Sequence, residues 1–219
     1  MGFSVTAEAG GYVERCASLC KKSYPNYDVT KVAIGGLQPY HARHLARGIV
    51  DTQKPDALII EMATAAYRDQ PESQGLVADH LDSMEALLAI CKDRKMACGI
   101  LDLPKTGIIG DRDWTVETNA ELSRRCSIPH SAVPLNQDIL RDEVHPTEEG
   151  KDLYAKALYE LVDAVFHAEP DFSDLAPARS FDAYAMKNIN ITGADYGNFS
   201  RTGFDEKMLI EAYDRMKQD

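Results

Sequence analysis

The chain has 219 residues, of which 44% are hydrophobic and 27% charged, and this composition is typical of one globular domain with or without a tail. No apolar run approaches the roughly 20 residues that a membrane span needs, and the first residues lack the basic and apolar regions of a secretion signal. The 35 acidic residues outnumber the 24 basic ones, and no basic stripe is visible, which argues against binding to a nucleic-acid backbone. We therefore expect a cytoplasmic protein that binds neither membrane nor nucleic acid, and its oligomeric state stays open.

The predicted elements alternate between helical and extended patterns. In chain order we expect helix 12–24, strand 27–34, helix 41–52, strand 56–63, helix 75–94, strand 95–103, helix 115–126, strand 130–135 and helix 147–166. Such alternation predicts an α/β fold of three layers, with a mainly parallel central sheet covered by helices on both faces. We expect this domain to span residues 1–167.

The composition changes after about residue 168. Residues 168–219 are rich in Asp, Pro, Asn and Gly, with one possible strand at 188–192 and one possible helix at 205–217. We interpret 168–219 as a C-terminal extension of the α/β domain.

The five cysteines are an odd number without a secretion signal, which predicts free thiols in a reducing compartment. No further metal-ligating residues lie near these cysteines at the spacing that a zinc site needs, so we predict no metal. A Gly-rich phosphate-binding motif is also absent from the sequence, so no cofactor is predicted.

The most informative loop is Asp142-Glu143-Val144-His145-Pro146, which precedes the last core helix. An acid three residues before a histidine in a turn can hold one imidazole nitrogen and leave the other free to accept a proton. By itself the pattern also fits an ordinary polar loop. A histidine base needs a nucleophile, and Ser4 in Gly2-Phe3-Ser4-Val5 is the candidate.

Together these segments resemble the SGNH, or GDSL-type, hydrolase family. Gly2-Phe3-Ser4-Val5 looks like the first block of that family, with Phe3 where Asp is usual, and 32–36 (Val-Ala-Ile-Gly-Gly) looks like the second block. Asp142 and His145-Pro146 match the last block, and the resemblance covers about residues 2–166.

The resemblance implies a flavodoxin-like three-layer fold and hydrolysis or transfer of an acyl group. Ser4 would attack the acyl carbonyl, His145 would carry the proton, and Asp142 would orient His145. The backbone amides of Ser4 and Gly36 would stabilise the oxyanion. The expected substrate is a small O-acyl ester, such as an O-acetyl group on a carbohydrate.

The third block departs from the family pattern. Where the family has Gly-x-Asn-Asp, this chain has Ala63-Thr64-Ala65-Ala66, so Ala65 replaces the Asn that donates to the oxyanion. Losing one such donor costs about 3–4 kcal/mol, or roughly 100- to 1000-fold in rate, which predicts a slow or narrowly specific enzyme. Thr64, Tyr67 and Arg68 in the same loop are the candidate substrate-binding residues.

The start of the chain is the second departure, because only three residues precede Ser4 where a strand of about 5–6 residues is expected. The given chain could lack that strand, the segment 188–192 could fill its place, or Ser4 is not the nucleophile. Two other functions therefore stay open: an O-acyltransferase with the same residues, and a catalytically degenerate domain that binds a glycan or a protein partner.

Overall fold

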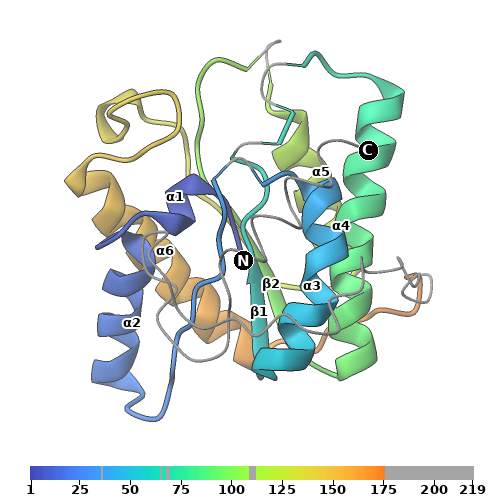
Figure 1. Cartoon of the computed structure of the whole chain (residues 1–219), viewed down its shortest axis with the longest axis horizontal. Coiled ribbons are helices and arrows are strands. Elements are labelled where there is room, and N and C mark those ends of the chain that lie inside the picture. The colour runs from blue at the N-terminus through green and yellow to red at the C-terminus, as the bar shows by residue number, and fades with distance from the viewer. Residues whose placement is uncertain (36, 65, 68–69, 109–111, 176–219) are drawn as a thin grey trace.

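The computed structural model describes residues 1–35, 37–64, 66–67, 70–108 and 112–175 (Figure 1). The strand predicted at 188–192 and the helix predicted at 205–217 lie outside the described residues. The division of the chain into 1–167 and 168–219 therefore stays a prediction. Within the described part of the chain, no helix is both long and apolar enough to span a bilayer.

A parallel sheet forms the centre of the fold. Its strands β1 (Ala57–Ile60), β2 (Ala97–Asp102) and β3 (His130–Ala132) lie in that order, with Ile60 of β1 opposite Ile100 of β2. Every residue of β2 after Ala97 is buried. This burial explains why β2 is continuously apolar up to Asp102, as expected for a strand covered on both faces.

Met1 and Gly2 extend this sheet beyond β1. The Met1 nitrogen donates to the Ile59 carbonyl at 2.6 Å, and the Glu61 amide donates to the Met1 carbonyl at 2.8 Å. On the other side, Gly2 forms a parallel bridge with Ala33. Counted along the chain, the five extended segments thus have the spatial order 2-1-3-4-5, which is the flavodoxin-like order.

Helices cover both faces of the sheet. Helices α2 (Tyr12–Ser23) and α6 (Glu148–His167) pack together on one face, and α6 contacts all three strands. Helices α3 (Pro39–Gln53), α4 (Gln74–Arg94) and α5 (Trp114–Arg125) cover the other face (Figure 1). Each face has its own buried apolar cluster, so the predicted three-layer α/β/α class is confirmed.

The predicted helices agree with the structure to within about two residues, but one predicted strand is wrong. The extended pattern at 27–34 yields only the bridge at Ala33, because among the described residues Gly2 alone pairs with this segment as a neighbouring strand would. Two short elements were not predicted: α1 (Ser4–Ala7) and the 3-10 turn η1 (Gln137–Ile139). Both are shorter than the window over which hydrophobic periodicity can be read.

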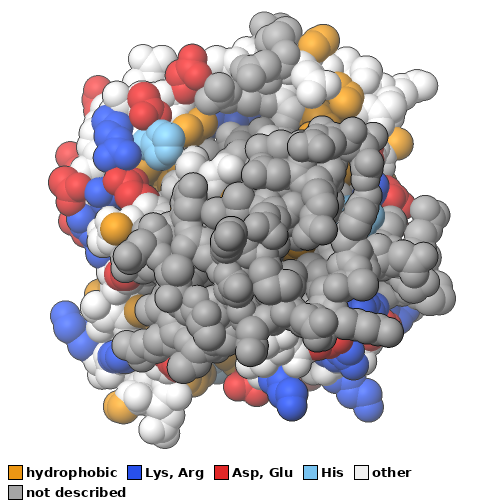
Figure 2. Space-filling view, viewed as in Figure 1, with side chains coloured by type: hydrophobic (Ala, Val, Ile, Leu, Met, Phe, Trp, Pro, Cys, Tyr) orange, Lys and Arg blue, Asp and Glu red, His pale blue; other side chains and the backbone are white. Residues whose placement is uncertain are grey.

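The charged side chains in the view of Figure 2 are mixed in sign. Acidic and basic groups are interspersed around the described part of this face, with no large area of one sign. Charged side chains of the described residues also form ion pairs, including Arg15 with Asp152 and Arg141 with Glu8.

Candidate active site

Ser4, His145 and Asp142 meet at the carboxyl edge of the sheet. Ser4 is the first residue of α1, and Phe3 separates it from the Met1–Gly2 segment. The other two residues lie in the loop before α6. The His145 Nε2 atom lies 3.1 Å from the Ser4 Oγ atom. The His145 Nδ1 atom lies 2.9 Å from Asp142 Oδ2 and 3.0 Å from Oδ1. Hydrogen bonds thus link the hydroxyl, the imidazole and the carboxylate in series.

Asp142 is held by the backbone of its own loop. Its Oδ1 atom accepts hydrogen bonds from the amides of His145 at 2.8 Å and Val144 at 3.0 Å. Partial desolvation opposes its charge, but these amides and the His145 ring outweigh it and lower the pKa of Asp142 to about 2. Asp142 is therefore a carboxylate at neutral pH and can fix the orientation of the imidazole.

A backbone bridge and a helix cap hold the loop that carries His145 in place. Leu140 forms an antiparallel bridge with Pro146, and the Thr147 hydroxyl caps α6 by accepting from the Gly150 amide at 3.2 Å. Ser4 lies across from this loop, and a Cβ atom on Gly35 would lie 3.9 Å from the Ser4 Cβ atom. The loop that begins at Gly35, at the end of the second block (32–36), therefore lies beside Ser4. Gly36 itself lies outside the described residues.

Replacement of Gly150 by alanine should disturb this loop. A Cβ atom there would lie 2.3 Å from the Ile139 carbonyl oxygen and 2.9 Å from the Pro146 Cβ atom, so backbone must move. We expect Gly150→Ala to lower the free energy of unfolding by about 1–3 kcal/mol, measured by urea denaturation. The matched control is Gly75→Ala in α4, where a Cβ atom meets nothing within 4 Å. That control should be neutral or stabilising by up to about 1 kcal/mol, and equal effects of both changes would contradict the prediction.

A buried carboxylate holds the segment that contains Ser4. Glu61, which is 2% exposed and follows β1, accepts hydrogen bonds from the Thr6 hydroxyl at 2.8 Å and from the Phe3 amide at 3.4 Å. It also accepts from the Thr64 hydroxyl. Burial raises the pKa of Glu61, while these donors favour its charged form. Glu61 thus links Phe3 and Thr6, which lie on either side of Ser4, to Thr64 in the loop that follows β1. We call this loop, residues 63–68, the third-block loop.

A buried ammonium group holds the same third-block loop from the other side. Lys105, which is 4% exposed and follows β2, donates to the carbonyls of Ala63 and Ala66 and to the Thr115 hydroxyl at 3.0 Å. Its Nζ atom also lies 3.2 Å from an Asp113 carboxylate oxygen. Burial lowers the pKa of Lys105, and Asp113 opposes that shift.

Sequence reasoning missed both Glu61 and Lys105. The available signal was their position after an apolar strand of a parallel sheet, because Glu61 directly follows β1 and Lys105 comes three residues after the end of β2.

The remaining predicted site residues lie in the third-block loop. Thr64 is buried and its hydroxyl is bonded to Glu61. Tyr67 is 5% exposed, has a positive φ of 50°, donates its hydroxyl to Asp79 and packs against Trp114 with ring centroids 5.4 Å apart. Arg68 and Ala65 lie outside the described residues. A substrate-binding role for Thr64, Tyr67 and Arg68 stays a prediction.

Comparison with known proteins identifies the fold. No family model matches the sequence, and no curated protein matches it. Solved structures do match. A catalytic mutant of the acetylxylan esterase Axe2 from Geobacillus stearothermophilus has a TM-score of 0.60 at 16% identity, over 74% of this chain and 91% of the other.

Two further structures agree with this match. The lipase/acylhydrolase from Enterococcus faecalis has a TM-score of 0.60 at 14% identity, over 78% of this chain and 95% of the other. A GDSL-like lipase from Bacteroides thetaiotaomicron has a TM-score of 0.55 at 18% identity, over 74% of this chain and 85% of the other. The chain therefore has the fold of SGNH/GDSL-type hydrolases.

Proposed function

We propose that this protein is a serine ester hydrolase in which Ser4 is the nucleophile, His145 the general base and acid, and Asp142 the residue that orients His145. The single observation that carries the proposal is the 3.1 Å distance from Ser4 Oγ to His145 Nε2, with Asp142 on the opposite ring nitrogen. A serine hydroxyl is inert until a positioned base accepts its proton, and this arrangement supplies that base.

The reaction proceeds in two halves. The Ser4 Oγ atom attacks the acyl carbon as its proton passes to His145 Nε2, and the tetrahedral intermediate then expels the alcohol, which takes that proton. Water attacks the resulting acyl-serine, again losing a proton to His145, and releases the carboxylic acid and free Ser4. Asp142 stays ionised throughout and stabilises the protonated imidazole.

The negative oxygen of each tetrahedral intermediate needs hydrogen-bond donors. In this proposal the backbone amides of Ser4 and Gly36 donate to it, and Ala65 contributes no side-chain donor. Glu61 and Lys105 do not react; they are positioning residues that hold the two loops carrying these groups. We expect turnover to be slow because one donor is missing.

The proposed substrate is a small O-acyl ester, and specifically an O-acetyl group on a carbohydrate. Support comes from the similarity in fold to the acetylxylan esterase, together with the partly exposed position of the reacting side chains. The side chain of His145 is 29% exposed and that of Asp142 is 51% exposed, so the site is open enough for an ester on a bulky alcohol.

A covalent probe tests the proposal directly. A fluorophosphonate should add to one residue, Ser4, as read by intact mass and peptide mapping, and it should fail to label Ser4→Ala. The matched control Ser18→Ala removes an exposed hydroxyl on α2 and should label as fully as the parent protein. Labelling at another residue, or none in the folded protein, would refute the assignment. Product analysis with and without a sugar acceptor then separates hydrolysis from acyl transfer.

A further inference from the structure

Glu8 links the segment that carries Ser4 to the loop that carries His145. It directly follows α1, and its Oε1 atom accepts a hydrogen bond from the Arg141 guanidinium at 2.9 Å. Arg141 lies in the same loop as His145, and its amide donates to the His145 carbonyl at 2.9 Å. A polar contact besides the hydrogen bond between Ser4 and His145 therefore joins the two halves of the candidate active site.

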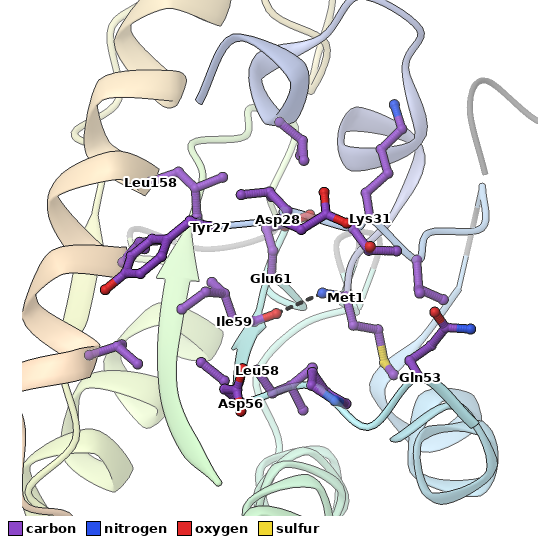
Figure 3. Close-up of a pocket in the computed structure, with 18 of the residues that line it drawn as sticks. Met1, Tyr27, Asp28, Lys31, Gln53, Asp56, Leu58, Ile59, Glu61 and Leu158 are labelled. Carbon is purple, nitrogen blue, oxygen red and sulfur yellow. Dashed lines mark hydrogen bonds between the residues drawn. The ribbon is translucent and has the colours of Figure 1, made fainter. Parts of the chain in front are cut away.

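The backbone of Glu8 is fixed in a tight turn. Its carbonyl accepts from the Gly11 amide at 3.2 Å, and Gly10 has a positive φ of 60°, which glycine adopts without strain. The buried Lys31 side chain donates to the same Glu8 carbonyl at 2.8 Å. Lys31 lies at a cavity of about 650 Å³ beside Met1, and Figure 3 shows its side chain pointing away from the Met1 amino group. The Lys31 ammonium therefore fixes the turn after α1 to the chain segment that borders this cavity.

The Glu8 side chain is largely shielded from water. It is 16% exposed, and its Oε1 atom also lies 3.1 Å from the ammonium of the buried Lys151 in α6. Ion pairs between fully exposed side chains contribute little because water and salt screen them, whereas this carboxylate is screened far less. The side chain of Arg141 is 48% exposed. Glu8 and Lys151 thus form the fixed part of the contact, and Arg141 is the part that belongs to the loop.

We propose, on the basis of the proposed ester hydrolysis, that Glu8 is a positioning residue that sets the distance between Ser4 and His145. The contacts of Glu61 hold the segment of Ser4 to the third-block loop, and the bridge and cap described above hold the loop of His145 to α6. Neither set of contacts joins that segment to that loop, whereas Glu8 does. A misplacement of about 1 Å between reacting groups can lower a rate about 100-fold, so this contact bears on proton transfer although Glu8 touches no reacting atom.

Two substitutions break the contact from opposite sides. Glu8→Gln removes the charge and keeps the size of the side chain. We expect kcat for p-nitrophenyl acetate to fall about 10-fold while KM stays within about twofold of the parent value, because ester binding depends little on the loop. Arg141→Gln leaves the Glu8–Lys151 pair intact, so it should keep the parental Tm, and it should lower kcat to a similar extent. Because both changes remove one contact, the double variant should be about as slow as the slower single variant.

Glu148→Gln is the matched control. Glu148 is a second carboxylate partner of Lys151, 2.7 Å from its Nζ atom, but it is 76% exposed and also pairs with Arg15 of α2. This control should retain the parental kcat, because it removes a partner of Lys151 without releasing the loop of His145. Equal falls in kcat for Glu8→Gln and Glu148→Gln would overturn the proposal. Unchanged kcat in both Glu8→Gln and Arg141→Gln would overturn it as well.

Hydrogen exchange tests the hold of Glu8 on the loop without any turnover. The amides of Arg141 and Thr147 donate to carbonyls within the loop at 2.9 and 2.8 Å, so their protection factors report its order. Glu8→Gln and Arg141→Gln should each lower both protection factors several-fold, whereas Glu148→Gln should not. A parent protein that shows this pattern but has no esterase activity would support the hold of Glu8 on the loop and refute the ester hydrolysis. Unchanged protection at both amides would overturn the role of Glu8 whatever the activity.

Discussion

Ser4→Ala and His145→Ala should each lower kcat for an activated acetate ester, such as p-nitrophenyl acetate, by at least about 10³-fold. Without the Ser4 hydroxyl no acyl-enzyme forms, and without the His145 ring nothing accepts its proton across the 3.1 Å contact. KM should change far less than kcat, because neither group is needed to bind the ester before reaction. Steady-state kinetics on the purified variants measures both parameters.

The double variant sharpens this test. Residues that act as one unit are not additive, so Ser4→Ala combined with His145→Ala should be about as slow as either single change. The matched controls are Ser18→Ala and His167→Ala. Both alter exposed side chains that, within the described part of the chain, hydrogen-bond to carbonyls of their own helices. These controls should retain full activity. Unchanged turnover in both single variants would refute the assignment of the nucleophile and base.

Lys105→Met should lower both stability and turnover. The change removes the buried donor to the carbonyls of Ala63 and Ala66 and leaves Asp113 without its ammonium partner. Breaking such a buried pair costs about 3–5 kcal/mol, and the side chain of Asp113 is 22% exposed, so we expect about 2–4 kcal/mol here. Urea denaturation of the parent and the variant measures this difference.

The activity of Lys105→Met separates its positioning role from a general loss of stability. At a temperature where the variant is fully folded, kcat should fall while KM changes little, because the loop beside the reacting groups loses its anchor. Lys156→Met is the matched control, since Lys156 lies 3.9 Å from Glu160 and is 72% exposed. That control should change stability by less than about 0.5 kcal/mol. A Lys105→Met protein with parental stability would contradict the anchoring role.

Local patterns in the sequence predicted one part of the candidate site, the turn that contains Asp142 and His145. Asp142 and His145 lie three residues apart in a turn ahead of a capped helix, and the structure places both side chains as this spacing predicts. Ser4 could be named only through the resemblance to a family, because no local pattern distinguishes it from a surface serine. Its hydrogen bond to a residue 141 positions away depends on the whole sheet.

The position of Glu61 and Lys105 after a strand was too weak a signal to identify them as the anchors of the site. Glu61 and Lys105 interact with residues from other loops, and a charged residue after a strand is usually solvated rather than buried. The same limit explains the error at 27–34, because an extended pattern becomes a strand only where a partner supplies hydrogen bonds.

The sequence by itself determined the alternation of helices and strands, the parallel three-layer class and the Asp142–His145 turn, since these follow from periodicity and from contacts between near neighbours. Only the tertiary structure decided that Ser4 faces His145 and that two buried charges anchor the loops around it. The physical reason is that these features depend on which backbone edges and side chains lie together across the sheet, and sequence spacing carries no information about that.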